Sequence, residues 1–228
     1  MLSKSKIEIT FTGGEETNGI EEIFRERFSS IKRDVLPYET EVYEPHKGEI
    51  KEIEENMEVS QAKLVIGMKL RDYDYDKIIM PVAVDIFGGD PTSLLFRNVR
   101  EKLSLCYYCA ARYVKETRCV YVDCGILPEN KDKALKEILN QLDKVKAGDF
   151  SEEDLENIKK SRITALETAS DFMESTDRWY FDRILAEDSL SLEEAIERVS
   201  KITKEDVVMC AKKIEPDTVF FLNTVEGI

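Results

Sequence analysis

The side chains that most often carry enzyme chemistry are scarce in this sequence. Its 228 residues contain a single histidine, His46. Hydrolytic zinc sites hold the metal through several protein ligands, often histidines, and histidine is also the side chain that titrates closest to neutral pH. One histidine cannot supply a histidine-rich metal site. We therefore expect any chemistry of this chain alone to depend on carboxylate, cysteine, lysine, arginine or tyrosine side chains.

His46 nevertheless opens a short pattern that is similar to a zinc-binding sequence. The segment His46-Lys47-Gly48-Glu49-Ile50 matches the first four positions of H-x-x-E-H, but an isoleucine stands at the fifth. That motif requires two histidines one turn apart on a helix. The segment follows Pro45 and contains Gly48, and neither residue favours a helix interior. We interpret the match as accidental.

Four of the five cysteines are concentrated in one segment rich in strand-forming residues: Cys106, Cys109, Cys119 and Cys124. The spacings C-x2-C and C-x4-C invite interpretation as a zinc site. In a regular strand, however, residues three or five positions apart point to opposite faces, so neither pair could chelate one ion. The intervening Tyr107-Tyr108 also lacks the turn chemistry of a zinc knuckle. We favour small buried hydrophobic side chains over zinc ligands here.

The spacing of apolar residues predicts the elements that would position such groups. Alternation predicts a strand at 7–11, and apolar residues three and four apart predict a helix at 20–31. Further strands are expected at about 63–68, 107–114, 119–126 and 218–222, and helices at 75–87, 91–103 and 134–145. Capping-box sequences begin a long helix at Ser151, whose apolar stripe continues to Ile184, and two short helices at Ser191 and Thr203. Hairpin-connected strands with segregated helices indicate an α+β fold, an antiparallel sheet covered on one face by helices.

The segment from Gly88 to Tyr107 carries the most specific pattern. It begins with Gly88-Gly89, continues as a helix that ends in Arg100-Glu101-Lys102, and reaches Tyr107 after a four-residue turn. This order resembles the C-terminal half of insulinase-like (pitrilysin-type) zinc metallopeptidases, in which a Gly-Gly turn precedes S-x-L-F-x-x-[LV]-R-E-K and then x-x-L-x-Y. The order of the expected elements from about Lys63 to Asn223 agrees with that family.

The resemblance implies a two-halved enzyme in which the N-terminal half carries H-x-x-E-H and the zinc. The C-terminal half contributes an arginine and a tyrosine, here Arg100 and Tyr107, that reach the substrate carbonyl and backbone. A cation and a phenol O–H are donors suited to a tetrahedral oxyanion. The resemblance also suggests four substrate-binding positions, Gly88, Gly89, Ser93 and Phe96. Without it, Arg100 would be interpreted as a cation that stabilises a helix C-terminus, and Tyr107 as an amphipathic strand residue.

Three segments are expected along the chain. Residues 1–36 are similar to the strand and helix that end a preceding catalytic half. The glutamate-rich residues 37–58 are interpreted as an acidic connector, and residues 59–228 as the C-terminal insulinase-like domain. The chain then holds no metal or other cofactor of its own, and zinc is expected in the partner half.

Charge limits the choice of partners. The sequence has 33 Lys and Arg against 47 Asp and Glu, a formal net charge of −14. Nucleic-acid phosphates and anionic membranes both attract basic surfaces, so neither is an expected partner. No apolar run approaches the roughly 20 residues of a membrane span, and no secretory signal is recognised after Met1. We expect a cytoplasmic protein, or a fragment of a larger one.

Two functions follow as hypotheses. The first is the zinc-free, substrate-binding C-terminal half of an insulinase-like metallopeptidase, which acts on peptides together with a catalytic half in the same gene product or in a homologous subunit. The second is a catalytically inactive homologue that binds or scaffolds a protein partner. An upstream or co-expressed H-x-x-E-H favours the first, and a native start at Met1 without such a companion favours the second. In both cases the chain alone is expected to be inactive.

Overall fold

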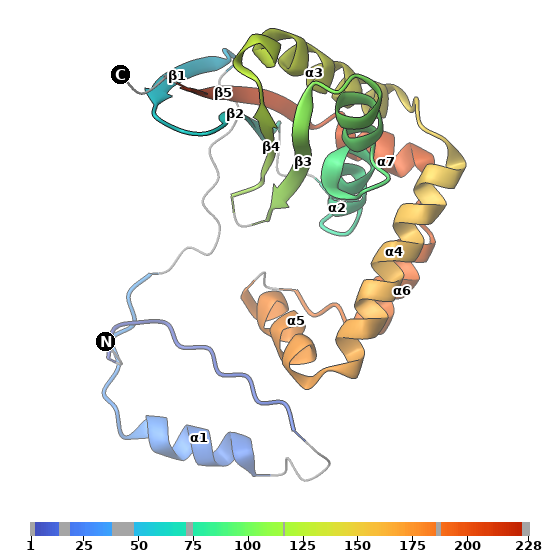
Figure 1. Ribbon diagram of the computed structural model, residues 1–228. Coiled ribbons are helices and arrows are strands. Elements are labelled where there is room, and N and C mark those ends of the chain that lie inside the picture. The colour runs from blue at the N-terminus through green and yellow to red at the C-terminus, as the bar shows by residue number, and fades with distance from the viewer. Residues whose placement is uncertain are drawn as a thin grey trace. The chain divides into compact units, whose positions relative to one another are not determined.

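The computed structural model describes residues 3–13, 19–37, 48–71, 75–115, 117–185 and 188–224 (Figure 1). The chain divides into two compact units. We call Val42–Ile163 with Arg198–Ile228 the sheet unit, and Met1–Glu41 with Thr164–Glu197 the helical unit. The grouping is not sequential, because residues from the first and the last third of the chain meet in the helical unit. In the described residues, no helix is long and apolar enough to cross a membrane.

The sheet unit is built on five strands: β1 Lys51–Met57, β2 Ala62–Leu70, β3 Cys106–Val114, β4 Cys119–Ile126 and β5 Ile214–Thr224. Their order across the sheet is β1-β5-β2-β4-β3. Every neighbouring pair is antiparallel except β1 with β5, which is parallel. The strands expected at 63–68, 107–114, 119–126 and 218–222 are confirmed, and β3 and β4 form the expected hairpin.

One face of this sheet forms the core. Along β2, the buried residues alternate with more exposed ones, and Leu64, Ile66 and Met68 are almost completely buried. The helices of the sheet unit present their own apolar residues, including Ile138 of α3 and Val207 of α7. Burying aliphatic side chains of this size contributes about 1.5–3 kcal/mol each, so this interface supplies most of the driving force. The α+β fold that the sequence predicts is confirmed.

The sheet unit contains the helices α2 Ile79–Val84, η1 Asp85–Gly89, η2 Leu95–Lys102, η3 Pro128–Asn130, α3 Lys131–Ala147 and α7 Lys204–Ala211, and the first part of α4 Glu152–Asp171. Figure 1 shows α2, α3 and α7 beside the sheet. Helices η1 and η2 are π-helices, and η3 is a 3₁₀ turn. Capping boxes at Ser151 and Thr203 are confirmed, because each side-chain oxygen accepts the backbone N–H three residues on and the carboxylate there accepts the capping residue's N–H.

The helical unit contains α1 Ile20–Ser29, the end of α4 Glu152–Asp171, α5 Met173–Leu185 and most of α6 Leu192–Ser200. Two threonines of the N-terminal segment, Thr10 and Thr12, donate hydrogen bonds to the Asp177 carboxylate on α5, both at 2.9 Å. These hydrogen bonds join the start of the chain to a helix that lies 167 and 165 positions later in the sequence. The capping box at Ser191 is also confirmed.

The strand expected at 7–11 is wrong, because these residues form no strand, although Thr10 contacts α5. The last part of the segment interpreted as an acidic connector, 37–58, forms strand β1. Its side chains are all exposed and therefore lack the alternation that marks a half-buried strand. Its backbone pairs with β5, so main-chain hydrogen bonds define this edge strand. Whether 1–36, 37–58 and 59–228 are separate domains stays a prediction.

The long helix predicted from Ser151 to Ile184 is interrupted at Phe172, between α4 and α5. The Ala169 carbonyl accepts the Phe172 N–H at 3.4 Å and also the Thr176 hydroxyl at 3.1 Å. A side-chain hydroxyl that takes a helical carbonyl competes with the backbone ladder. The Phe172 side chain is 60% exposed, so its burial does not oppose the interruption of the helix.

Candidate functional site

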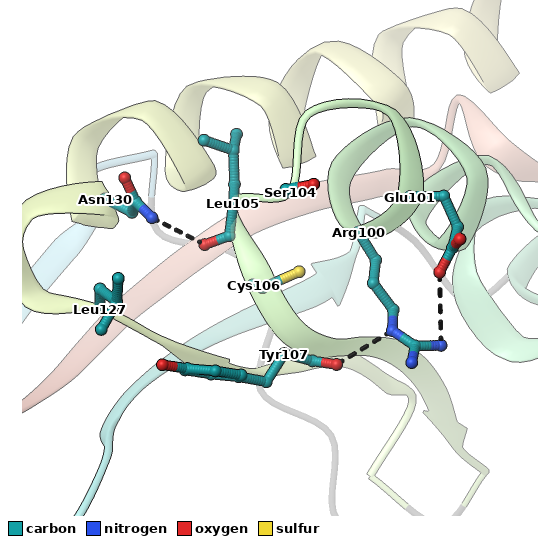
Figure 2. Close-up of a pocket in the computed structure, with 8 residues that line it drawn as sticks. All are labelled: Arg100, Glu101, Ser104, Leu105, Cys106, Tyr107, Leu127 and Asn130. Atoms are coloured by element: carbon teal, nitrogen blue, oxygen red, sulfur yellow. Dashed lines mark hydrogen bonds and ion pairs between the residues drawn. The ribbon is translucent and has the colours of Figure 1, made fainter.

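Arg100 and Tyr107, the two residues that the sequence places in the substrate site, line one hollow in the sheet unit. Its volume is about 400 Å³, and its walls come from the end of η2, the turn that follows, the start of β3, and the segment that leads into α3. Figure 2 shows the eight lining residues: Arg100, Glu101, Ser104, Leu105, Cys106, Tyr107, Leu127 and Asn130.

Helix η2 holds Arg100 at the edge of the hollow. The buried Leu95 and Val99 fix the inner side of the helix. The Leu103 N–H bonds to the Asn98 carbonyl five residues back, at 3.2 Å, which is the π-helical pattern. Short π-helical segments are frequent at functional sites. The sequence predicts an ordinary helix at 91–103, but in this wider winding its last residue, Leu103, is 46% exposed.

The turn between η2 and β3 has a strained backbone and long-range support. Ser104 has a φ of +50°, a left-handed conformation that ends the helix. Leu105 donates its N–H to the Val99 carbonyl at 3.0 Å, and its own carbonyl accepts from Asn130 Nδ2 at 3.3 Å. Asn130 immediately precedes α3, and its side chain makes no capping hydrogen bond to that helix. The turn is therefore tied to both the helix before it and the helix that covers the sheet.

A buried polar contact connects η2 to α3. Asn98 Nδ2 donates to Gln141 Oε1 at 2.7 Å, and Gln141 is completely buried. Gln141 in turn donates to the Glu137 carboxylate. Sequence reasoning did not identify Asn98, Asn130 or Gln141. The capping position of Asn130 is visible in the sequence, but the partners that these amides find 25 and 43 residues away are not.

The Arg100 guanidinium is oriented by three contacts. Its Nε donates to the backbone carbonyl of Tyr107 at 3.0 Å, and its Nη1 lies 3.7 Å from Glu101 Oε1. Its central carbon lies 4.7 Å from the centre of the Phe96 ring, within the range of a cation–π contact. The side chain remains 40% exposed. It therefore presents a positive charge to the hollow in a defined position.

Tyr107 lies on a β-bulge. In the pairing of β3 with β4, Cys106 faces Ile126 and Tyr108 faces Gly125, so Tyr107 is an extra residue on its strand. Bulges redirect side chains and often lie beside functional sites. The Tyr107 side chain is 57% exposed. Within the described residues its hydroxyl has no hydrogen-bond partner, so that donor is free to meet a ligand.

The four other positions that the sequence proposes are not among the residues lining the hollow. A Cβ added to Gly88 would lie 2.5 Å from Leu95 Cδ1 and 2.8 Å from Ala111 Cβ, so this glycine allows η1 to approach β3. At Gly89, an added Cβ would collide with the Asp85 carboxylate. Ser93 is buried, and its Oγ accepts the Phe96 N–H at 3.4 Å at the start of the helix. Phe96 contacts the hollow indirectly, as the ring beneath Arg100.

The bulge also changes the arrangement of the cysteines. The expectation that Cys106 and Cys109 point to opposite faces is wrong, because the extra residue shifts the alternation and their partners on β4, Ile126 and Cys124, are two positions apart. Cys109 Sγ also accepts a hydrogen bond from Cys124 Sγ at 3.0 Å. The hydrogen bond to Cys109, followed by burial, raises the pKa of the Cys106 thiol above its ordinary value. All five cysteines are free thiols.

These residues do not fit a zinc site. In the part of the chain that the structure describes, no three histidine, cysteine, aspartate or glutamate side chains are arranged to hold a metal ion. His46, which opens the incomplete H-x-x-E pattern, lies outside the described residues. With one histidine in the sequence, the chain cannot complete an H-x-x-E-H site.

Comparison with known proteins identifies the family. The family model described as the peptidase M16 inactive domain matches residues 1–162. The chain belongs to the peptidase M16 inactive-domain family. The resemblance to insulinase-like peptidases that the Gly88–Tyr107 pattern carries is thereby confirmed.

A curated relative and several solved structures extend this result. The chain is 30% identical over 229 residues to the probable inactive metalloprotease YmfF of Bacillus subtilis (strain 168), covering 99% of this chain and 53% of the relative. It matches a conserved protein from Enterococcus faecalis V583 with a TM-score of 0.81 at 25% identity, over 94% of this chain and 51% of that one. This M16 half domain therefore spans about half the length of these proteins.

More distant structures share the M16 fold. A protease from Helicobacter pylori matches with a TM-score of 0.81 at 17% identity, over 93% of this chain and 53% of that chain. The peptidase M16 inactive domain from Pseudomonas fluorescens matches with a TM-score of 0.74 at 15% identity, over 91% of this chain and 51% of that chain. At this level of identity, the similarity establishes the fold alone.

Proposed function

We propose that this chain is the zinc-free, substrate-binding half of an insulinase-like metallopeptidase and contacts peptides with Arg100 and Tyr107. The observation that carries the proposal is the convergence of these two residues on one hollow of about 400 Å³. The guanidinium is held on the Tyr107 carbonyl, and the Tyr107 hydroxyl is exposed and has no partner in the described residues. The pair thus offers a fixed cation and an adjustable O–H donor.

These two donors suit the charge that develops during peptide hydrolysis. Attack of a water on a peptide carbonyl places negative charge on the carbonyl oxygen, which preorganised donors stabilise. Arg100 and Tyr107 can bind and orient that carbonyl, but they cannot activate the water, and the single histidine of the sequence cannot complete an H-x-x-E-H zinc site. A half that carries H-x-x-E-H must supply the zinc, either in the same gene product or in a homologous subunit. The half-length match to the curated relative supports this arrangement.

We propose that the four remaining predicted positions, Gly88, Gly89, Ser93 and Phe96, support the site without lining the hollow. Phe96 orients Arg100 through its ring. The burial of Gly88 and Ser93 supports a role in the packing of η1 and η2 rather than direct contact with a peptide. Gly89 also has a packing role, because a Cβ at this position would collide with the Asp85 carboxylate.

The assignment is tested in the assembled enzyme, with this chain joined to or mixed with its H-x-x-E-H half. We expect Arg100→Ala and Tyr107→Phe each to lower kcat for a fluorogenic peptide by about 100–1000-fold, as for other oxyanion donors. Thermal stability should change little in both. Arg112→Ala, an exposed arginine on β3 outside the hollow, is the matched control. Unchanged kcat in both hollow variants would refute the assignment.

A second candidate function is a catalytically inactive subunit that binds or scaffolds a protein. The name of the B. subtilis relative, a probable inactive metalloprotease, favours it. The two candidates differ in what the complete gene product does. If that product binds no zinc and cleaves no peptide, even with every copurifying subunit present, the scaffold function holds. One zinc per catalytic half together with peptide cleavage would exclude it.

A further inference from the structure

Three of the five thiols form a continuous chain that starts in the wall of the hollow. Cys106 lines the hollow and is half-buried, and Figure 2 shows its sulfur beside the Arg100 side chain. The bulge at Tyr107 places Cys106 and Cys109 on the same face of β3, because their partners on β4, Ile126 and Cys124, are two positions apart. Cys109 in turn lies directly opposite Cys124 in the β3–β4 register, with 3.0 Å between the two sulfur atoms.

The deeper pair is placed for a covalent bond but is shielded from solvent. A disulfide has an S–S distance of about 2.0 Å and a Cβ–Cβ distance of about 3.5–4.5 Å. Directly opposite residues on antiparallel strands have Cβ atoms about 4.5–5.5 Å apart. Closing the bond between Cys109 and Cys124 therefore needs only a small movement. Their exposed fractions are 5% and 0%, so a reagent in water cannot easily reach either sulfur.

We propose that Cys106, Cys109 and Cys124 form a thiol–disulfide exchange site that accepts a low-molecular-weight disulfide through the hollow and stores the oxidation as a Cys109–Cys124 disulfide. Cys106 is the first thiol to react, because it alone of the three faces the hollow. Exchange with Cys109 and then with Cys124 passes the disulfide inward. This modification site is independent of the proposed peptidase function.

The exchange balances in three steps. The Cys106 thiolate attacks one sulfur of the small disulfide RSSR, which forms a mixed disulfide and releases one RS⁻. The Cys109 thiolate attacks Cys106 Sγ, releases the second RS⁻ and forms Cys106–Cys109. The Cys124 thiolate then attacks Cys109 Sγ and returns Cys106 to a thiol. Two protein thiols lose two protons and two electrons, and RSSR takes both to become two RSH.

The groups around Cys106 and Cys109 determine how fast the two thiols react. The Cys109 hydrogen bond and burial raise the pKa of Cys106, whereas the charge of Arg100 lowers it, and the raising effects dominate. The pKa of Cys109 is raised as well: a hydrogen bond with Cys106 lowers it, but one with Cys124 and burial outweigh that effect. Because thiolates are the attacking species, the exchange is slow near neutral pH and accelerates as the pH rises.

The test uses the full chain incubated with oxidised glutathione at several pH values, followed by alkylation of free thiols and peptide mass spectrometry. We expect one internal disulfide that joins Cys109 to Cys124, with Cys106, Cys119 and Cys210 still open to alkylation after unfolding. Cys119 is the internal control, since its thiol bonds to the Thr117 carbonyl rather than to another thiol. Persistent free thiols at both Cys109 and Cys124 would overturn the proposal.

Variants separate the relay from direct oxidation of the deep pair. Cys106→Ser should abolish the Cys109–Cys124 disulfide on the timescale of the wild type, and Cys119→Ser should leave its formation unchanged. Cys124→Ser should stop the exchange at Cys106–Cys109. If Cys106→Ser forms the deep disulfide as fast as the wild type, Cys106 is not the first thiol. Circular dichroism of each variant checks its fold, and Cys106→Ala replaces Cys106→Ser if the latter fails to fold.

Discussion

Arg100 and Tyr107 are linked to each other before any ligand arrives. The guanidinium Nε donates to the carbonyl of Tyr107, a bulged residue that does not pair with β4. A change at Arg100 therefore acts both on the charge in the hollow and on the start of β3. Tyr107→Phe removes only the hydroxyl, so it is the cleaner test of ligand contact.

Gly88 illustrates a residue whose importance lies in packing. We predict that Gly88→Ala destabilises the fold by about 1–3 kcal/mol, because its methyl group would overlap Leu95 and Ala111. Urea denaturation measures the free energy of unfolding. Gly67→Ala is the control, since a Cβ there would lie at an ordinary 3.8 Å from Thr218 Cβ. Equal stability of the two variants would contradict the close packing of η1 on β3.

Tyr108, the neighbour of Tyr107, is predicted to ionise at a higher pH than an ordinary tyrosine. Burial, followed by the charge and hydrogen bond of Asp123, raises the pKa of Tyr108 to about 12 from an ordinary 10.0. Between these values the unfolded chain loses the phenol proton while the folded chain keeps it. Stability from this group is therefore complete below pH 10 and is lost as the pH rises toward 12.

Ultraviolet titration of tyrosinate tests this expectation. The spectrum of Tyr108→Phe subtracted from that of the wild type isolates the one residue. Asp123→Asn should lower the pKa of Tyr108 but leave it above the ordinary value, because burial is the larger cause. Ionisation of wild-type Tyr108 at the ordinary value would show that the phenol is solvated in solution.

At the scale of elements, the hollow depends on how η2 and the start of β3 are attached to α3. Asn130 holds the Leu105 carbonyl and Gln141 holds the Asn98 side chain. Both anchors are on or beside α3, which packs on the sheet. Displacement of α3 would therefore move Arg100 and Tyr107 together.

We predict that Gln141→Leu destabilises the protein by about 1–3 kcal/mol, because a buried amide is removed and the Asn98 donor loses its acceptor. Chemical denaturation gives the free energy of unfolding. The exposed neighbour Asn140 offers the control, and Asn140→Ala should change stability by less than about 0.5 kcal/mol. An unchanged free energy of unfolding in Gln141→Leu would mean that the connection between η2 and α3 is not energetically important.

At the scale of the molecule, the chain has the fold of one half of an M16 protein, and its single histidine cannot complete an H-x-x-E-H site. It spans 53% of its curated relative. Under the proposed function, the net charge of −14 favours basic peptides in a chamber formed with a second half, and the hollow contributes binding and orientation there.

We predict that the purified chain binds less than stoichiometric zinc and cleaves no peptide, because its single histidine cannot complete H-x-x-E-H. Elemental analysis after dialysis and a broad fluorogenic peptide panel measure both properties. The assembled two-half protein serves as the comparison. One tightly bound zinc per isolated chain would contradict the prediction and indicate a site that includes residues outside the described ranges.

Local patterns in the sequence predict much of this structure. Some features depend only on residues that are close in the chain. They are the alternation of buried and exposed residues along β2, the β3–β4 hairpin, and the capping boxes at Ser151 and Thr203. The Gly88–Tyr107 pattern identifies the family and places Arg100 and Tyr107 together, since only seven positions and one turn separate them. Short-range spacing and capping chemistry are sufficient for these conclusions.

Only the tertiary structure decides the remaining features. The exposed strand β1 has no periodic signal, because its pairing with β5 comes from backbone groups. The bulge at Tyr107 depends on registration against β4, and it brings Cys106 to Cys109 against the alternation of a regular strand. Asn130 and Gln141 find their partners across the fold. These contacts join residues distant in sequence, so their geometry is specified by the packing of the whole sheet unit rather than by any local pattern.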